Sequence, residues 1–208
     1  LVMGDLCLEG KGRRLGSFGD VLLRELEAQV LPDGGHVSRN PEVPAELLLD
    51  LIPLGQCLRT AGVPLAAKLD PLVRRMLRFV RAMRLGDGSL ARFNGAGPLG
   101  VDAVAMVLPY DPEPDARVSL SRASGYARLE RGGMVAIMDA GAPPRLALTR
   151  DAAAGCLSFE LSIGAERVLV NGGRPDFAGP ETAAQARSTA AHNTAVIAGQ
   201  PSGELVRN

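Results

Sequence analysis

The sequence is poor in the residues on which several classes of binding site depend. Aromatic residues make up 3% of the 208 positions, and tryptophan is absent, so aromatic platforms for stacking nucleic-acid bases are not expected. Lysine and arginine together number 23, as do aspartate and glutamate. This balance gives no overall field that would favour nucleic acids or acidic membranes. We therefore expect no nucleic-acid partner.

Long apolar runs and paired cysteines are missing too. No apolar stretch approaches the roughly 20 residues that a membrane-spanning helix needs, and no signal peptide is visible. Cys7, Cys57 and Cys156 are an odd number at scattered spacing, which favours buried free thiols over a disulfide framework. The chain opens at Leu1 inside a helical pattern, and we interpret it as a piece of a longer protein.

The first part of the sequence has helical periodicity. Apolar residues recur at spacings of three and four over residues 17–31, 45–60 and 66–85, which predicts three amphipathic helices. Pro53 lies inside the second run and predicts a kink or an early end. Basic side chains crowd one side of the third run. We interpret that side as a solvated face, with a groove for an anionic polymer as the alternative.

After Gly86 the pattern changes to short strand-like runs separated by glycine and proline. Two β-hairpins and a fifth strand are predicted, over residues 126–131 with 134–139, 157–162 with 167–171, and 192–197. Helices followed by strands indicate segregated layers or two domains. We divide the chain into a helical part at 1–88, a linker at 89–120 and a β part at 121–208.

Only two histidines occur, and we expect both to mark functional segments. His36 lies in a turn-rich stretch between two helical patterns, and His192 opens the fifth predicted strand. Histidine titrates near neutrality and is the commonest metal ligand; the alternative is a hydrogen-bonded structural role. Of the two tyrosines, Tyr126 is expected to pack across the sheet and Tyr110 to lie on the surface.

Four stretches, taken in order, resemble a known family. They are residues 31–42, 86–95, 154–162 and 187–196, and they are similar to segments of the heparinase II/III-like family. The resemblance implies an α+β multidomain protein: the end of an α/α toroid followed by an antiparallel β-sandwich, with both parts incomplete in this chain. On this interpretation the chain is a fragment.

The resemblance also implies a polysaccharide lyase that cleaves a uronic-acid-containing acidic polysaccharide by β-elimination, in the cell envelope or periplasm. His36 and His192 would be catalytic, and His192 would be a ligand of a zinc ion whose remaining ligands lie outside the chain. Substrate-binding roles fall to Arg39, Asn40, Arg187 and Asn193.

Two positions depart from the pattern of the active lyases. Val43 stands where they place a catalytic tyrosine, and Ala190 where they often have a further histidine. Valine cannot exchange a proton, so a second hypothesis stays open. It is a non-catalytic relative that binds an acidic glycan or serves in envelope assembly.

Overall fold

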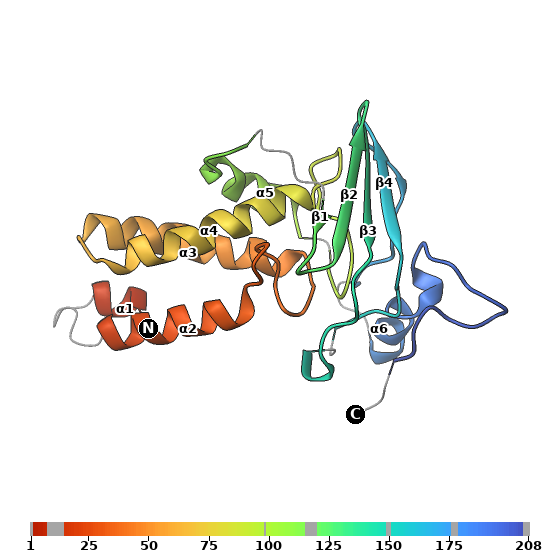
Figure 1. Cartoon of the computed structure of the whole chain (residues 1–208), viewed down its shortest axis with the longest axis horizontal. Helices are drawn as coiled ribbons and strands as arrows, with labels where there is room; N and C mark the ends of the chain where they lie inside the picture. The colour runs from red at the N-terminus through yellow and green to blue at the C-terminus, as the bar shows by residue number, and fades with distance from the viewer. Residues whose placement is uncertain are drawn as a thin grey trace.

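The computed structural model describes residues 2–7, 15–97, 99–114, 120–148, 151–175 and 179–205. Long helices lie side by side in one half of the molecule, and an antiparallel sheet stands across their ends (Figure 1). Helix α6 (Pro180–Ala186) lies at the lower end of the sheet in this view. The expected fold class, helices followed by an antiparallel sheet, is therefore confirmed.

The helical part holds the three predicted helices. Its elements are α1 (Val2–Cys7), α2 (Leu15–Gln29), α3 (Glu42–Thr60) and α4 (Leu65–Ala82). A four-residue turn joins α3 to α4, and the two pack into a hairpin whose apolar faces form the main core. Leu48, Leu58, Met76 and Val80 are fully buried there. Burial of this kind supplies most of the stability of a packed helix pair.

Pro53 does not end its helix. α3 continues through Pro53 to Thr60, so the prediction of an early end is wrong. Proline removes one backbone hydrogen bond inside a helix. The turns that follow bury Leu54 and Leu58 in the core, and this apolar burial outweighs the missing bond.

The segment expected to be a linker, residues 89–120, contains helical structure of its own. α5 (Val101–Val107) continues into the 3-10 helix η1 (Leu108–Tyr110). Val104 and Val107 are buried, and α5 packs against α3. The helical part therefore extends through η1.

The sheet has five antiparallel strands in sequence order. They are β1 (Leu120–Ser121), β2 (Tyr126–Arg131), β3 (Met134–Asp139), β4 (Phe159–Ile163) and β5 (Glu166–Leu169). Both predicted hairpins are present. Gly132 and Gly133 join β2 to β3 with φ of 57° and 80°, backbone values that favour glycine and suit a two-residue hairpin turn.

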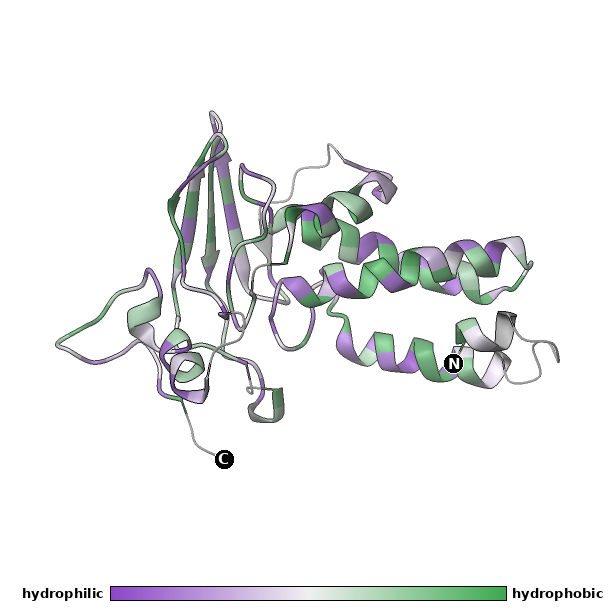
Figure 2. Cartoon of the chain, turned by 180° about the vertical axis from the view of Figure 1, so that it is seen from behind, coloured by the Kyte–Doolittle hydropathy of each residue, from purple (hydrophilic) through white to green (hydrophobic). Residues whose placement is uncertain are grey.

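The two faces of the sheet differ. Cross-strand partners share a face, so Tyr126, Ile137 and Glu160 lie on the face toward the helices, and all three are buried. Leu129 and Met134 lie on the other face and are exposed. Figure 2 shows alternating apolar and polar bands along the strands, which is the pattern of a sheet with one buried face.

The fifth predicted strand is not formed. After α6 (Pro180–Ala186) comes the 3-10 helix η3 (Thr189–Ala191), and His192 follows it in extended backbone outside the sheet. Within the described residues 192–197, the structure has an isolated bridge from Ile197 to Gln200 and one hydrogen bond from the Phe159 N–H to the Asn193 carbonyl at 3.2 Å, but no strand. Apolar alternation requires a neighbouring strand to become a ladder, and 77% of Ile197 is exposed.

Two smaller expectations concern membranes and thiols. Among the described residues, no helix combines the length and apolar character needed to cross a membrane. Cys57 and Cys156 are free thiols, but Cys57 is exposed and Cys156 half-buried, which corrects the expectation that they are buried. The side chain of Cys7 lies outside the described part.

Candidate functional site

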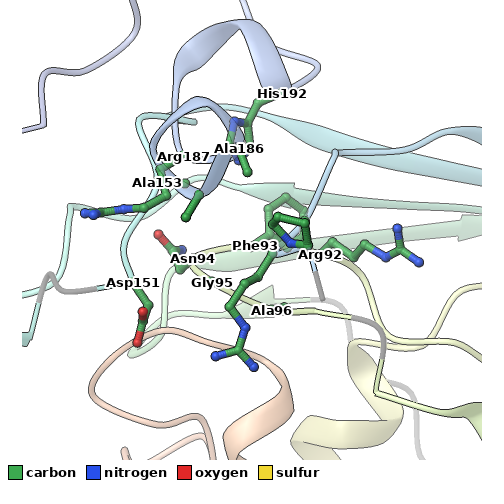
Figure 3. A pocket seen from close by; sticks show the side chains of 14 residues that line it. Arg92, Phe93, Asn94, Gly95, Ala96, Asp151, Ala153, Ala186, Arg187 and His192 are labelled. Carbon is green, nitrogen blue, oxygen red and sulfur yellow. The ribbon is translucent and has the colours of Figure 1, made fainter. Parts of the chain in front are cut away.

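A pocket with an empty volume of about 430 Å³ lies where the loop after α4 meets the C-terminal segment. Figure 3 shows Arg187 and His192 on one side of it, with Arg92, Phe93 and Asn94 opposite. The pocket draws on five separate parts of the chain, and its lining residues are Arg92, Phe93, Asn94, Gly95, Ala96, Asp151, Ala153, Gly173, Arg174, Pro175, Ala183, Ala186, Arg187 and His192.

The wall at residues 92–96 is held by buried polar contacts. Asn94 has φ of 48°, an uncommon conformation outside glycine. Its side-chain amide donates to the Tyr126 hydroxyl at 2.9 Å and to the Asp139 carboxylate at 3.0 Å. Asn171 donates to the Arg92 carbonyl at 3.1 Å. These contacts therefore fix the backbone of the pocket wall that carries Arg92.

His192 is half-buried on the opposite wall. Its Nδ1 lies 2.8 Å from the Ser188 carbonyl oxygen, and an Nδ1–H donor is the tautomer that fits this acceptor. That tautomer leaves a lone pair on Nε2. The ring also packs on Gly155, where an added Cβ would lie 2.7 Å from the ring Cδ2. A glycine at this position is what allows the imidazole to take this place.

The charge of the pocket is positive. Three arginines line it against one carboxylate, Asp151. Arg187 is fixed in part by donating from Nε to the Ala152 carbonyl at 2.7 Å, whereas Arg174 extends from an exposed turn. Guanidinium groups bind carboxylates and sulfates through paired hydrogen bonds, so this composition suits an anionic ligand.

The structure brings together two of the predicted site residues, Arg187 and His192. Asn193 follows His192 but does not line the pocket: its backbone N–H donates to the Asn171 side chain at 2.9 Å. Its own amide nitrogen is buried and has no hydrogen-bond partner among the described residues. Asn193 thus orients the segment that carries His192.

The three candidates from the helical part, His36, Arg39 and Asn40, do not line this pocket. Arg39 is 7% exposed, and its guanidinium donates to the carbonyls of Ser124 and Ala142 and to Asp139. The Asn40 side chain accepts the Glu42 N–H at 2.9 Å, at the start of α3. Both side chains therefore hold the loop in place.

His36 lies outside the pocket as well. Its ring contacts Ser38 Oγ at 2.7 Å and Gln29 Oε1 at 3.4 Å. Burial lowers the pKa of His36, because the charged form loses hydration. A neutral, hydrogen-bonded ring is what the structural alternative predicted.

Neither tyrosine is placed to act as a base in the pocket. Tyr126 is 2% exposed, and its ring packs against Phe93 and Phe79 with centroid distances of 5.2 and 6.3 Å. Burial, followed by the charge of Asp139, raises the pKa of Tyr126 far above its usual range. Tyr110 is exposed at a separate hollow beside α3 and α4. Tyr126 thus has the structural role that we expected, and Tyr110 lies on the surface, as predicted.

Sequence reasoning missed Arg92, Asp151 and Arg174. Arg92 lies in the stretch 86–95, which we had matched to the family, and that match was the available signal. Asp151 and Arg174 stand in turns with no distinguishing pattern. Only the folding of five chain segments onto one another brings them to the pocket.

The predicted zinc ligand has no companions in the described part of the chain. No group of three histidine, cysteine, aspartate or glutamate side chains is close enough there to hold a metal ion. A structural zinc site takes four ligands and a catalytic one usually three from the protein. The described residues therefore do not fit zinc by themselves, and zinc stays a prediction.

Comparison with known proteins agrees with this architecture. Residues 113–208 match the family described as heparinase II/III-like, C-terminal. The FtsZ-localized protein C of Caulobacter vibrioides is 35% identical over 159 residues, which are 76% of this chain and 28% of that protein.

Solved structures share the fold at low sequence identity. A mutant of heparan sulfate lyase HepC from Pedobacter heparinus has a TM-score of 0.73 at 18% identity, over 91% of this chain and 34% of that one. A heparinase III has a TM-score of 0.72 at 16% identity, over 96% and 36%. The chain thus spans about a third of these structures. Residues 113–208 thus match the C-terminal part of the heparinase II/III-like family, and the fold of the described residues is that of these solved structures.

Proposed function

We propose that the pocket of Arg92, Arg174, Arg187 and His192 binds a uronic acid unit of an acidic polysaccharide, as part of a polysaccharide lyase-like protein of the cell envelope or periplasm. The observation that carries the proposal is the gathering of three arginines and one of two histidines at one pocket. In a chain with equal numbers of acidic and basic residues, this excess of positive charge is local.

The same groups suit β-elimination. The proton on the carbon next to the uronate carboxylate is weakly acidic, and an arginine paired with that carboxylate stabilises the enolate-like charge that develops when the proton leaves. The Nε2 lone pair of His192 accepts the proton. The electron pair then forms the ring double bond and expels the glycosidic oxygen, which takes a proton from an acid or from water.

A second candidate is a relative that binds the glycan without cleaving it. Val43, in the first turn of α3, and Ala190, in η3, replace residues that active lyases use. No described tyrosine lines the pocket. These two observations favour glycan binding without cleavage. The same pocket would hold the glycan in either case.

An assay of the purified chain separates them. Heparan sulfate, hyaluronan, alginate and polygalacturonate are each incubated with the chain while the ultraviolet absorbance of unsaturated uronate is followed, and binding of labelled oligomers is measured in parallel. Cleavage that His192→Ala abolishes supports the lyase. Binding without cleavage supports the second candidate, and absence of both contradicts the proposal.

The zinc prediction needs its own measurement. With one candidate ligand in the described residues, we derive no catalytic step through a metal. Because the remaining ligands are predicted outside this chain, elemental analysis after exposure to Zn²⁺ uses a protein that contains the chain together with those ligands, and its His192→Ala variant. The prediction requires bound zinc that the substitution removes.

A further inference from the structure

A second, wider groove lies at the same end of the sheet as the pocket. It runs between the loop after α2 and the two loops that precede β2 and follow β3, and its empty volume is about 1350 Å³. Gln29 and Val37 line the helical side. Arg122 and Ser124 come from the turn before β2, and Arg145 comes from the loop after β3, beside the 3-10 helix η2 (Leu146–Leu148).

One buried side chain, Arg39, holds the two loops that carry Arg122 and Arg145. Arg39 donates from Nε to the Ser124 carbonyl at 2.7 Å and from Nη1 to the Ala142 carbonyl at 2.8 Å. Each acceptor lies within three residues of an arginine of the groove. Arg39 therefore holds both loops in register with each other.

Two further contacts hold the turn before β2 in place beside the groove. The Asp33 carboxylate accepts the Ser124 N–H at 2.7 Å and its hydroxyl at 2.9 Å, which joins the turn before β2 to the helical part. Gly125 and Gly141 approach so closely that an added Cβ on Gly125 would lie 2.3 Å from the Gly141 Cα. The groove is thus preorganised, which lowers the cost of ordering its loops when a ligand binds.

The electrostatics of the groove select an anion. Arg122 and Arg145 are exposed, and no aspartate or glutamate lines the groove within the part of the chain that the structure describes. Buried Arg39 is already paired with Asp139. The two exposed guanidinium groups are the ones that a ligand can reach, and guanidinium binds oxyanions by paired hydrogen bonds.

We propose that this groove is a second binding site for oxyanions, and that its ligand is a further acidic unit of the sugar chain held by the pocket. The inference thus rests on the proposed function. Asp139 joins the two sites: one carboxylate oxygen accepts from Arg39, which lines the groove, and the other from Asn94, which lines the pocket. A polymer with regularly spaced acidic groups contacts both; a free ion occupies only one.

Fluorescence anisotropy of a labelled tetragalacturonate tests the inference. The groove variant is Arg122→Gln with Arg145→Gln, and the pocket variant is Arg92→Gln with Arg174→Gln. The matched control, Arg78→Gln with Arg131→Gln, removes the same charge from exposed arginines that line neither site. Circular dichroism confirms that each variant folds. We expect the groove variant to bind the tetramer about fivefold more weakly than the control, the size for two exposed charge contacts.

Competition with unlabelled galacturonate and with sulfate identifies the ligand. The monomer is expected to compete equally well in the groove variant and in the unmodified chain, since it needs the pocket alone. If the groove variant binds the tetramer as tightly as the control does, the inference is overturned. The affinity of the pocket variant tests the proposed function separately. Sulfate that competes as well as the tetramer means that the groove takes a free ion, which also overturns it. If the groove variant loses tetramer affinity and the pocket variant does not, the result contradicts the proposed function of the pocket.

Discussion

The Tyr126 hydroxyl lies at the meeting point of the helical part and the sheet. It accepts a hydrogen bond from Asn94 at 2.9 Å and donates to the Arg39 carbonyl, and the Arg39 guanidinium carbon lies 5.1 Å from the centre of its ring. All three side chains are buried. A buried hydroxyl satisfied in both directions stabilises the fold, because its removal leaves both partners without a bond.

Replacing Tyr126 with phenylalanine should therefore lower the free energy of unfolding by about 1–3 kcal/mol. The ring and its packing against Phe93 stay, so the folded structure is kept. Urea denaturation followed by circular dichroism measures the change. Tyr110→Phe is the control, with an expected change below about 0.5 kcal/mol, since half of Tyr110 is exposed. Equal effects from the two substitutions would contradict the role given to the Tyr126 hydroxyl.

The burial of His36 is expected to make the free energy of unfolding depend on pH. Burial lowers its pKa in the folded chain below the usual value of 6.5. Between the two pKa values the unfolded chain binds more protons, so the free energy of unfolding falls as pH decreases through this window. The slope is at most about 1.4 kcal/mol per pH unit for one proton. Denaturation from pH 7.5 to 5 should show a fall that His36→Gln reduces; an unchanged fall in His36→Gln refutes this.

The individual side chains show what the sequence can and cannot predict. His192 and Arg187 were found because histidine is rare in the chain and the surrounding stretch resembles a family. Arg39 was expected to bind a sugar carboxylate, yet it bonds to Ser124 and Ala142, which lie 85 and 103 positions away. No local pattern shows such partners, so whether a polar residue meets ligand or protein is decided only by the fold.

At the scale of elements, a buried ion pair joins the loop before α3 to the end of β3. Arg39 and Asp139 have side-chain exposures of 8% and 7%. Removing one member leaves the other charge buried without its partner, which typically costs 3–5 kcal/mol. Asp139 also holds Asn94, so its loss loosens the wall of the pocket as well.

We expect Asp139→Asn to destabilise the chain by about 3 kcal/mol or more and to weaken binding at the pocket. The control is Arg59→Gln, at the exposed pair with Asp70, which should cost below about 1 kcal/mol. Chemical denaturation and oligosaccharide binding are the two measurements. A loss no greater than that of the control would show that the buried pair does not join the two parts.

The turn after α2 makes a second junction, at Gly34. Its φ is 90°, and an added Cβ would lie 2.0 Å from the Arg75 carbonyl oxygen in α4. Gly34→Ala should therefore destabilise by more than about 3 kcal/mol, since both strain and a backbone clash act. Gly132→Ala, at φ of 57° with nothing nearby, carries the strain alone, about 1–2 kcal/mol. Thermal melts of the two variants compare them, and equal losses would refute the clash.

Helices and strands could be predicted from the sequence where neighbouring residues determine them. The three long helices follow from apolar spacing, and the first hairpin matches residue for residue, because Gly132 and Gly133 fix its turn. The stretch from His192 to Ile197 has the same alternation, but one backbone hydrogen bond, from the Phe159 N–H at the start of β4 to the Asn193 carbonyl, does not extend into a ladder. Sequence alternation thus indicates an extended backbone, and only neighbours turn it into a sheet.

At the scale of the whole molecule, the sheet has one face against the helices and a second face, called the bare face, whose apolar side chains are exposed in the described part of the chain. The bare face is apolar across three strands, with Leu129, Met134, Met138 and Ile163 between 38% and 73% exposed. The register places Met134 opposite Ile163, and Leu129 opposite Ala136, which lies between Met134 and Met138 on the same face. Contiguous apolar surface of this kind is rare in isolated monomers and promotes association.

The 208-residue chain should therefore bind an environment-sensitive apolar dye and self-associate as its concentration rises. Placing charge on the bare face, as Leu129→Glu with Met138→Lys, should reduce both dye fluorescence and association, because it breaks the apolar patch without touching the buried face. The control Val21→Glu, an exposed apolar residue on α2, should leave both near the level of the unmodified chain. Fluorescence and light scattering give the readouts. A monomer that melts cooperatively and binds no dye would contradict the prediction, because it would mean that the apolar side chains of the bare face are covered in solution.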